Sequence, residues 1–287
     1  MLDYFEFQTS IIQFISNNMA KTGKILLSAG IWLLSFLIMG GIVFYQNLTG
    51  PTHPVKDKIE ISGEQLSYVL PRSSDSRGDE IIKITAHSEQ ISGKLKYKRY
   101  KSNDEWSVTD MTRTGNELTV NIPHQPPAGK VIYQLTLNDG TKTYDLYKKP
   151  VVIRFRGEVP AWVIIPHILL MFLSVLFAVR TGFEAILKRK NTYIYTIITM
   201  LLFLIGGFVL GPMVQKYAFG VYWSGFPFGY DLTDNKVFLS LIFWVVAFFK
   251  LRKNKENTKW AVIAACVFLV IYLIPHSMLG SELKYTK

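Results

Sequence analysis

Two Ile-Pro-His triplets, at residues 165–167 and 274–276, carry the side chains in this sequence that are best suited to chemistry. Both triplets lie in long apolar segments, where an ionisable side chain is costly and usually faces the interior of a helix bundle. Measured along a helix, His167 lies about 7 to 8 Å inward from Trp162. His276 lies about 24 Å from the opposite edge of a hydrocarbon core that is about 30 Å thick. The two histidines are therefore predicted at a similar depth, near one face of a membrane.

Two imidazoles at one depth are a ligand set for haem iron or another metal ion, and they can also relay protons. We therefore take His167 and His276 as the candidate metal ligands, with haem or a metal ion as the cofactor that they would hold. A structural interpretation competes with this one. Each histidine follows a proline near a helix end, where it can hydrogen-bond to a backbone carbonyl that the proline leaves without a donor.

A second polar group lies around the start of the fourth apolar segment and in the C-terminal tail. Asp231, Asp234 and Glu282 offer carboxylate oxygens for a calcium ion or a polar substrate, although their spacing is not that of an EF-hand. Together with Trp223 and the two histidines, they form the predicted ligand site. The alternative is that Thr233 or Asp234 caps the N-terminus of the following helix.

The segment 211–236 joins two apolar segments and contains seven aromatic residues interleaved with glycines. Aromatic side chains favour the membrane–water interface, where the ring is in an apolar layer and its N–H or O–H group reaches water. Glycines permit the tight bends that such a loop needs. We predict an outer aromatic loop that covers the helices like a lid.

Familiar catalytic signatures are missing from the sequence. It contains no phosphate-binding loop, no HExxH, no CxxC and no GxSxG motif, so we expect a protein that is not an enzyme. The single cysteine, Cys266, lies in an apolar segment and excludes an intrachain disulfide bond.

Long apolar segments must position these side chains, and they indicate a multi-pass membrane protein. Residues 1–24 have a roughly helical spacing of apolar side chains, which predicts an amphipathic leader on the cytoplasmic surface; a disordered leader is the alternative. Residues 25–45 form the first predicted transmembrane helix. Residues 161–287 form a four-helix transmembrane domain, with crossings at residues 161–179, 192–210, 237–249 and 260–274.

The net charge of +11 is concentrated in short loops between the apolar segments. Residues 180–192 carry a net charge of +3, and residues 250–259 carry +4. Lysine and arginine in such loops mark the cytoplasmic side. We therefore predict a bacterial cytoplasmic-membrane protein with a cytoplasmic N-terminus and an extracytoplasmic C-terminus, in contact with the lipid bilayer and not with nucleic acid.

Residues 54–155 alternate apolar and polar side chains with the period of β-strands, as at residues 94–100, 118–122 and 131–137. Asn138-Asp139-Gly140 is a hairpin signal between the last of these runs and the next. The order of Tyr97, Trp106 and the strand-like runs resembles the immunoglobulin-like and fibronectin type III-like modules of bacterial extracytoplasmic proteins. This resemblance implies a β-sandwich with a core around Trp106, and a domain that binds a protein partner.

The predicted fold is therefore mixed: a five-helix transmembrane bundle with an inserted extracytoplasmic all-β sandwich. The predicted function is that of an accessory, scaffold or sensor subunit whose residues 54–155 dock a protein partner. The alternative is a membrane redox or transport protein that uses His167 and His276 at the outer face.

Overall fold

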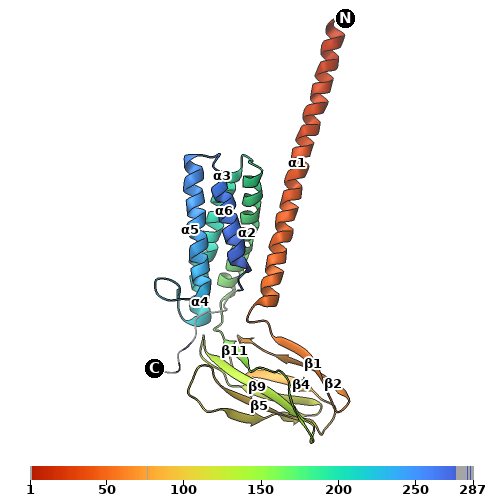
Figure 1. Ribbon diagram of the computed structural model, residues 1–287, viewed down its shortest axis with the longest axis vertical. Coiled ribbons are helices and arrows are strands. Elements are labelled where there is room, and N and C mark those ends of the chain that lie inside the picture. The colour runs from red at the N-terminus through yellow and green to blue at the C-terminus, as the bar shows by residue number, and fades with distance from the viewer. Residues whose placement is uncertain (1, 76, 276–282, 284, 286–287) are drawn as a thin grey trace. The chain divides into compact units, whose positions relative to one another are not determined.

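The computed structural model describes residues 2–75, 77–275, 283 and 285 of the chain (Figure 1). The protein combines helices and β-sheets, as the mixed fold class predicts. The helical elements are α1 (Leu2–Thr49), α2 (Ala161–Ile186), α3 (Thr192–Phe203), the π-helix η1 (Leu204–Leu210), α4 (Gly211–Phe219), α5 (Leu232–Lys253) and α6 (Lys259–Leu273).

Four helical stretches are long and apolar enough to cross a membrane: Lys21–Thr49, Ala161–Ile186, Thr192–Phe219 and Leu232–Lys253. The third of these runs without interruption through α3, η1 and α4. Helix α6 is also apolar but has only 15 residues. A membrane location fits these lengths and compositions.

Several helix boundaries differ from the expected ones. The third crossing continues beyond residue 210 to Phe219, and the fourth runs from Leu232 to Lys253 instead of residues 237–249. Helix α1 continues from Leu2 to Thr49, so the predicted leader and the first predicted crossing belong to one helix. Helix α2 continues to Ile186, whereas the sequence places the end of that crossing at Val179. Helix α2 extends beyond Val179 because the charged residues that follow are buried as an ion pair inside the helix.

That ion pair joins Arg180 and Glu184, whose side chains are both fully buried and 2.5 Å apart. The Arg180 guanidinium also lies over the rings of Trp32 and Tyr195, at 5.2 and 5.1 Å from their centroids. A charge can be buried in a helical core when it is paired and faces aromatic rings. The two charges cancel, so the loop after α2 still carries its net +3 from residues 188–190.

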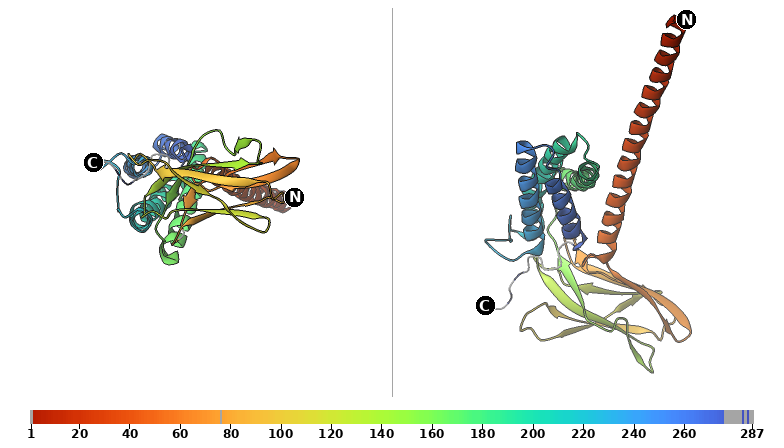
Figure 2. Two further views of the ribbon diagram at one scale, coloured as in Figure 1. Left: turned by 90° about the horizontal axis from the view of Figure 1, so that it is seen from below. Right: turned by 45° about the horizontal axis from the view of Figure 1, so that its top comes forward.

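The strands together form a β region between α1 and α2. Their bounds are β1 (Val55–Ile61), β2 (Glu64–Leu70), β3 (Ser73–Ser74), β4 (Glu80–Thr85), β5 (Ser92–Arg99), β6 (Ser107–Asp110), β7 (Thr112–Thr114), β8 (Glu117–Ile122), β9 (Lys130–Asn138), β10 (Thr143–Asp145) and β11 (Val151–Phe155). The largest sheet has the order β3-β11-β9-β5-β6, with β10 paired to β9. Strands β1 and β2 form a second sheet, and β4, β8 and β7 form a third (Figure 2).

One hydrophobic core is shared by all three sheets of the β region. It contains Leu66 from the two-stranded sheet, Ile84 and Leu118 from the three-stranded sheet, and Tyr133 and Ile153 from the largest sheet. The alternation along β9, where every second residue is buried, is the pattern that the sequence predicts. The expectation of a core around Trp106 is wrong, because Trp106 is half-buried outside this core.

The chain divides into two compact units. The helical unit contains Met1–Phe44, Leu170–Leu204 and Ser240–Leu273. The mixed unit contains Tyr45–Leu169, Ile205–Leu239 and Ile274–Lys287. The β region therefore belongs to the same compact unit as the aromatic loop and one end of several helices, including the end of α1 and the start of α2 and α5.

Candidate functional site

The predicted aromatic loop, residues 211–236, is helical at both ends: residues 211–219 form α4 and residues 232–236 begin α5. The irregular part is residues 220–231. Gly220 ends α4 with a positive φ of 84°, a conformation that glycine adopts without strain. Asp231 caps α5: its Oδ1 accepts a hydrogen bond from the Thr233 N–H at 2.8 Å. Its carbonyl accepts one from the Asn235 N–H at 3.1 Å. The predicted cap residues, Thr233 and Asp234, lie instead within the first turn of the helix.

Asp234 folds back onto the loop. Its Oδ2 accepts hydrogen bonds from the Ser224 N–H at 2.6 Å and from Gln215 Nε2 at 3.1 Å. The Ser224 hydroxyl is 3.2 Å from Asp231 Oδ2 and accepts a hydrogen bond from Gln215 Nε2 at 2.7 Å. Both carboxylates are buried, with exposures of 8% for Asp231 and 6% for Asp234. These bonds tie the loop to α4 and α5.

Glycine is required at two positions of this loop. A Cβ atom on Gly225 would lie 2.6 Å from the Asp234 Cβ, and one on Gly229 would lie 2.3 Å from the Ser224 carbonyl oxygen. Both approaches are closer than van der Waals contact allows, so the glycines permit the loop to close around the two carboxylates. The glycine spacing in the sequence thus reflects a compact polar turn.

Most of the rings in the aromatic loop point away from this turn. Five of the seven are exposed, with Phe228 at 83% and Tyr230 at 95%. Trp223 is half-buried, stacks on Phe208 of η1 at 5.6 Å between ring centroids, and donates its indole N–H to the Phe226 carbonyl at 3.1 Å. The loop therefore presents an exposed aromatic surface on a polar turn.

His167 lies in α2 and uses Nδ1 to hydrogen-bond the Gly206 carbonyl at 2.9 Å. Gly206 lies in η1, and the wider turns of a π-helix displace carbonyls from the regular ladder of hydrogen bonds. Because a carbonyl only accepts, Nδ1 carries the proton. His167 therefore bonds to a backbone carbonyl, as the structural alternative predicts, but the carbonyl belongs to the π-helix η1 and is not one that Pro166 leaves without a donor.

Two of the predicted site residues, His276 and Glu282, lie outside the described residues. The pairing of His167 with His276 therefore stays a prediction. Within the described part of the chain, no group of three or more His, Cys, Asp or Glu side chains is arranged to hold a metal ion. The structure brings Asp231 and Asp234 together, and it places Trp223 and His167 separately against η1.

Lys236 is a site residue that the sequence interpretation treats only as a side chain reaching for the interface. It is 6% exposed, and its Nζ donates to the carbonyls of Ile274 and Pro275 at 2.7 and 3.4 Å. Gln46 at the end of α1 donates to the same Ile274 carbonyl at 3.1 Å. The carbonyls that follow the last turn of a helix need such donors. One available signal was a lysine in the first turn of an apolar helix, where the helix dipole disfavours it.

Helix α4 is joined directly to the β region. The Gly157 N–H donates to the Ala218 carbonyl at 2.9 Å, and a Cβ atom on Gly157 would lie 2.2 Å from the Tyr217 carbonyl oxygen. The Arg154 guanidinium lies 4.6 Å from the centre of the Phe219 ring. The hydrogen bond between Gly157 and Ala218 depends on the glycine that follows β11, because any side chain at residue 157 would push the two backbones apart.

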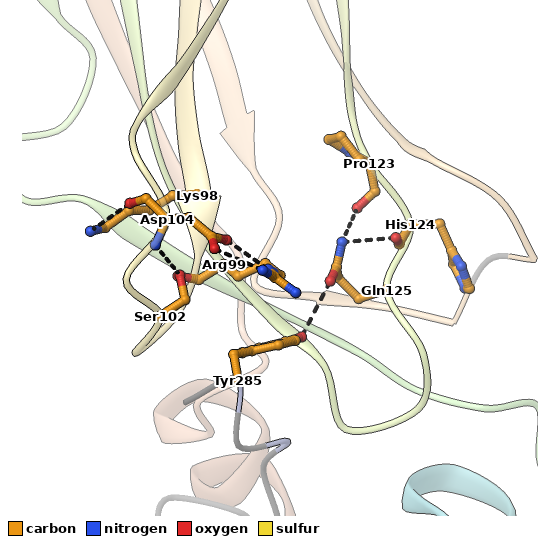
Figure 3. A network of polar contacts seen from close by, with 8 residues as sticks. All are labelled: Lys98, Arg99, Ser102, Asp104, Pro123, His124, Gln125 and Tyr285. Carbon is orange, nitrogen blue, oxygen red and sulfur yellow. Dashed lines mark hydrogen bonds and ion pairs between the residues drawn. The ribbon is translucent and has the colours of Figure 1, made fainter. Parts of the chain in front are cut away.

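The described residues of the C-terminal tail also contact the β region (Figure 3). The Tyr285 hydroxyl donates to Gln125 Oε1 at 3.2 Å, and the Arg99 guanidinium lies 4.8 Å from the centre of the Tyr285 ring. Asp104 holds Arg99 through bonds of 2.6 and 2.7 Å. These bonds from Arg99 lower the pKa of the Asp104 carboxyl to about 2.

A basic surface covers the outer side of β5, where Lys94, Lys96 and Lys98 alternate with side chains that point inward. The ammonium groups of Lys96 and Lys98 lie 5.0 and 5.4 Å from the centre of the Trp106 ring. Strand β6 is the edge of the same sheet, and all four of its residues are exposed. Val108 on this strand is 59% exposed. We call residues 94, 96, 98, 106 and 108 the lysine–tryptophan surface.

Comparisons with known proteins place this chain in no family. No family model matches the sequence, and no curated protein matches it. Among solved structures, the crystal structure of a bromine derivative of BhCBM56 matches with a TM-score of 0.25 and 11% sequence identity. The match covers 34% of this chain and 98% of that one.

Proposed function

We propose that this protein is a non-enzymatic scaffold or sensor subunit of a bacterial cytoplasmic membrane, whose extracytoplasmic β region docks a protein partner with an acidic surface. The β region would be a sandwich similar to immunoglobulin-like or fibronectin type III-like modules, inserted into a five-helix transmembrane bundle. The observation that carries the docking proposal is the lysine–tryptophan surface beside the exposed edge strand β6.

The topology is supported by two contacts with the β region. The end of α4 bonds to Gly157, and Tyr285 in the C-terminal tail bonds to Gln125. The end of α4 and Tyr285 are therefore expected on the same side of the membrane as the β region. This requires an even number of crossings between the β region and the end of α4, and again between the end of α4 and Tyr285. Helix α2 and the α3–α4 stretch supply two crossings before α4 ends, and α5 and α6 supply the next two. In this topology α6 is the fifth crossing, the N-terminus is cytoplasmic and the C-terminus is extracytoplasmic.

The exposed rings of the aromatic loop fit the bilayer as the second partner. On this topology the loop lies on the outer face, at the level where aromatic side chains anchor proteins in the headgroup layer. Phe226 and Phe228 are exposed apolar side chains with no polar atom, and burial in lipid removes them from water.

The lysine–tryptophan surface supports a partner of opposite charge. Trp106 supplies a large flat side chain of the kind that dominates binding energy in protein interfaces. Lys94 is paired with Asp110 of β6 at 3.5 Å, so Lys96 and Lys98 are the lysines that would face acidic groups on an extended segment. The outer edge of β6 offers backbone groups for strand pairing. Both features favour an acidic, extended segment of a partner protein.

Photo-crosslinking in cells tests this function. A photo-reactive phenylalanine analogue at Val108 should yield one dominant adduct, whose partner is identified by mass spectrometry and carries an acidic segment at the crosslink. The same analogue at Ile81, which is 54% exposed on β4, is the matched control and should yield no such adduct. Lys96→Glu with Lys98→Glu should abolish the Val108 adduct. An adduct that survives this charge reversal, or that forms equally from Ile81, would contradict the proposal.

A further inference from the structure

A small basic pocket lies in the mixed unit and is lined by residues other than those of the lysine–tryptophan surface. Its volume is about 220 Å³, and its described lining residues are Pro51, Thr52, Arg72, Tyr100, Lys130, Val152 and Arg154. These residues carry three positive charges and no carboxylate. Lysine and arginine side chains that converge on a cavity of this size are the donors that proteins use for phosphate groups.

Strand pairing forces two of the three cations together. Arg154 on β11 is directly opposite Lys130 on β9, so their side chains lie on the same face of the sheet. Like charges opposite each other on paired strands are unfavourable by themselves. Arg154 is also buried, with an exposure of 7%, and its guanidinium lies 4.6 Å from the centre of the Phe219 ring. The strand register therefore places two cations next to each other at the pocket, where an anion would interact with both.

Backbone hydrogen bonds keep the pocket in shape. The Tyr100 N–H donates to the Lys130 carbonyl at 2.9 Å, and the Arg154 N–H donates to the Arg72 carbonyl at 3.1 Å. The backbones of all three basic residues are thus held by the sheet and its adjoining turn. Tyr100 lies beside Lys130, whose Nζ is 5.7 Å from the ring centre. A site of this kind is organised before its ligand arrives, which lowers the entropic cost of binding.

The chain itself places the pocket at the edge of a membrane. Thr52 lies only three residues after Thr49, the last residue of the candidate span Lys21–Thr49. Three residues reach at most about 11 Å. The pocket is therefore within reach of the phosphate layer of the lipid leaflet in which α1 ends. Lysine and arginine side chains close to a membrane surface are attracted to anionic lipid headgroups.

We propose that this pocket binds the phosphate of an anionic phospholipid headgroup, with Arg72, Lys130 and Arg154 as its ligands. The lipid then holds the β region at a fixed height above the bilayer. The shared chemistry is a phosphate group, which a soluble phosphate compound would also offer. This inference does not depend on the partner surface, because it uses other residues and another ligand.

The test uses the full-length protein in nanodiscs of phosphatidylcholine that contain phosphatidylglycerol, followed by native mass spectrometry of the released protein. Wild-type protein should retain phosphatidylglycerol. Arg72→Gln and Lys130→Gln should each reduce its retention by about tenfold or more, as expected for a lost charged hydrogen bond. Lys83→Gln is the matched control, because Lys83 is an exposed lysine on β4 outside the pocket. Arg154 stays unchanged, because its buried side chain also contacts Phe219.

Thermal melting of each variant shows whether it folds, and Lys130→Glu adds a charge reversal that should exclude the lipid completely. Retention in the pocket variants equal to that of wild type would overturn the proposal. In a second arm, inorganic phosphate is added before release from the nanodisc. Retention that persists supports the lipid headgroup. Displacement of the lipid at low phosphate concentration would overturn the lipid assignment and identify a soluble phosphate as the ligand.

Discussion

At the scale of single residues, the buried carboxylates of the aromatic loop have defined and different tasks. Asp231 satisfies the first free N–H groups of α5, and Asp234 draws Ser224 and Gln215 together. Each accepts several hydrogen bonds, which offsets the cost of burying a carboxylate. The order of the loop therefore depends on these two side chains more than on its exposed rings.

Replacing the cap gives the first prediction. Asp231→Ala should destabilise the protein by about 1 kcal/mol, the usual cost of losing an N-cap. Asp231→Asn should cost less, because the amide oxygen can still accept from the Thr233 N–H. Thermal melting of the detergent-solubilised protein, with limited proteolysis of the loop, measures both effects. Equal melting of the alanine variant and wild type would contradict the assignment of Asp231 as the cap.

Asp104 gives a second prediction, on pH. Arg99 lowers the pKa of the Asp104 carboxyl from 3.8 to about 2 in the folded protein. A carboxyl with a lowered pKa stabilises the fold above its unfolded pKa, and this contribution is lost as the pH falls. Stability should therefore decrease from about pH 4 to about pH 2.

The measurement is thermal melting of wild type and Asp104→Asn across this range. The variant should lose less stability on acidification, since its amide does not titrate. Glu105→Gln is the control, because Glu105 is the neighbouring carboxylate and its side chain is exposed. An unchanged acid profile in Asp104→Asn would show that the contact with Arg99 does not stabilise the fold.

At the scale of elements, the end of β11 is the critical junction between the sheet and α4. Gly157→Ala should break the Gly157–Ala218 hydrogen bond, because the new methyl group would lie 2.2 Å from the Tyr217 carbonyl oxygen. Hydrogen–deuterium exchange at residues 151–159 should then become about tenfold faster, which corresponds to a loss of about 1.4 kcal/mol in the free energy of local opening. Gly78→Ala is the control, because nothing lies within 4 Å of a Cβ atom there. Unchanged exchange in Gly157→Ala would contradict the junction.

The elements were largely predictable from the sequence, because apolar period and turn chemistry are local signals. Strands β5, β8, β9 and β10 occupy the predicted runs, and the hairpin turn contains Gly140 with a φ of 90°. The end of α2 was not predictable from charge alone. Burial of Arg180 depends on Glu184 one turn later and on rings from α1 and α3, which are contacts between elements distant in sequence.

The candidate site was predictable only in part. Asp231 and Asp234 are close in sequence, and they meet through Ser224 as their spacing allows. The contact of His167 with Gly206 requires the π-helix, which no short-range pattern in the sequence indicates. Trp106 lies outside the core, near Lys96 and Lys98 on the outer face of β5, although a lone tryptophan among strands favours a buried position.

At the scale of the whole molecule, the proposed topology places the β region, the aromatic loop and the tail on one side of the membrane. The number of crossings between the end of α4 and the tail must then be even, so α6 crosses the membrane as well as α5. Its 15 residues span only about 22 Å as a helix. The bilayer can thin locally around a short helix, and flanking residues can extend it. The short loops around residues 188–190 and 250–259 are then cytoplasmic, in agreement with their positive charge.

The most direct test is cysteine labelling with a membrane-impermeant maleimide in a Cys266→Ser background. Single cysteines are placed at Thr109 in β6, Val221 in the aromatic loop, Leu283 in the tail and Asn254 in the loop after α5. The first three should be labelled in intact cells, and the Asn254 position only after the membrane is permeabilised. Labelling of the Asn254 position in intact cells, or protection of the Leu283 position while the Thr109 position reacts, would contradict the account.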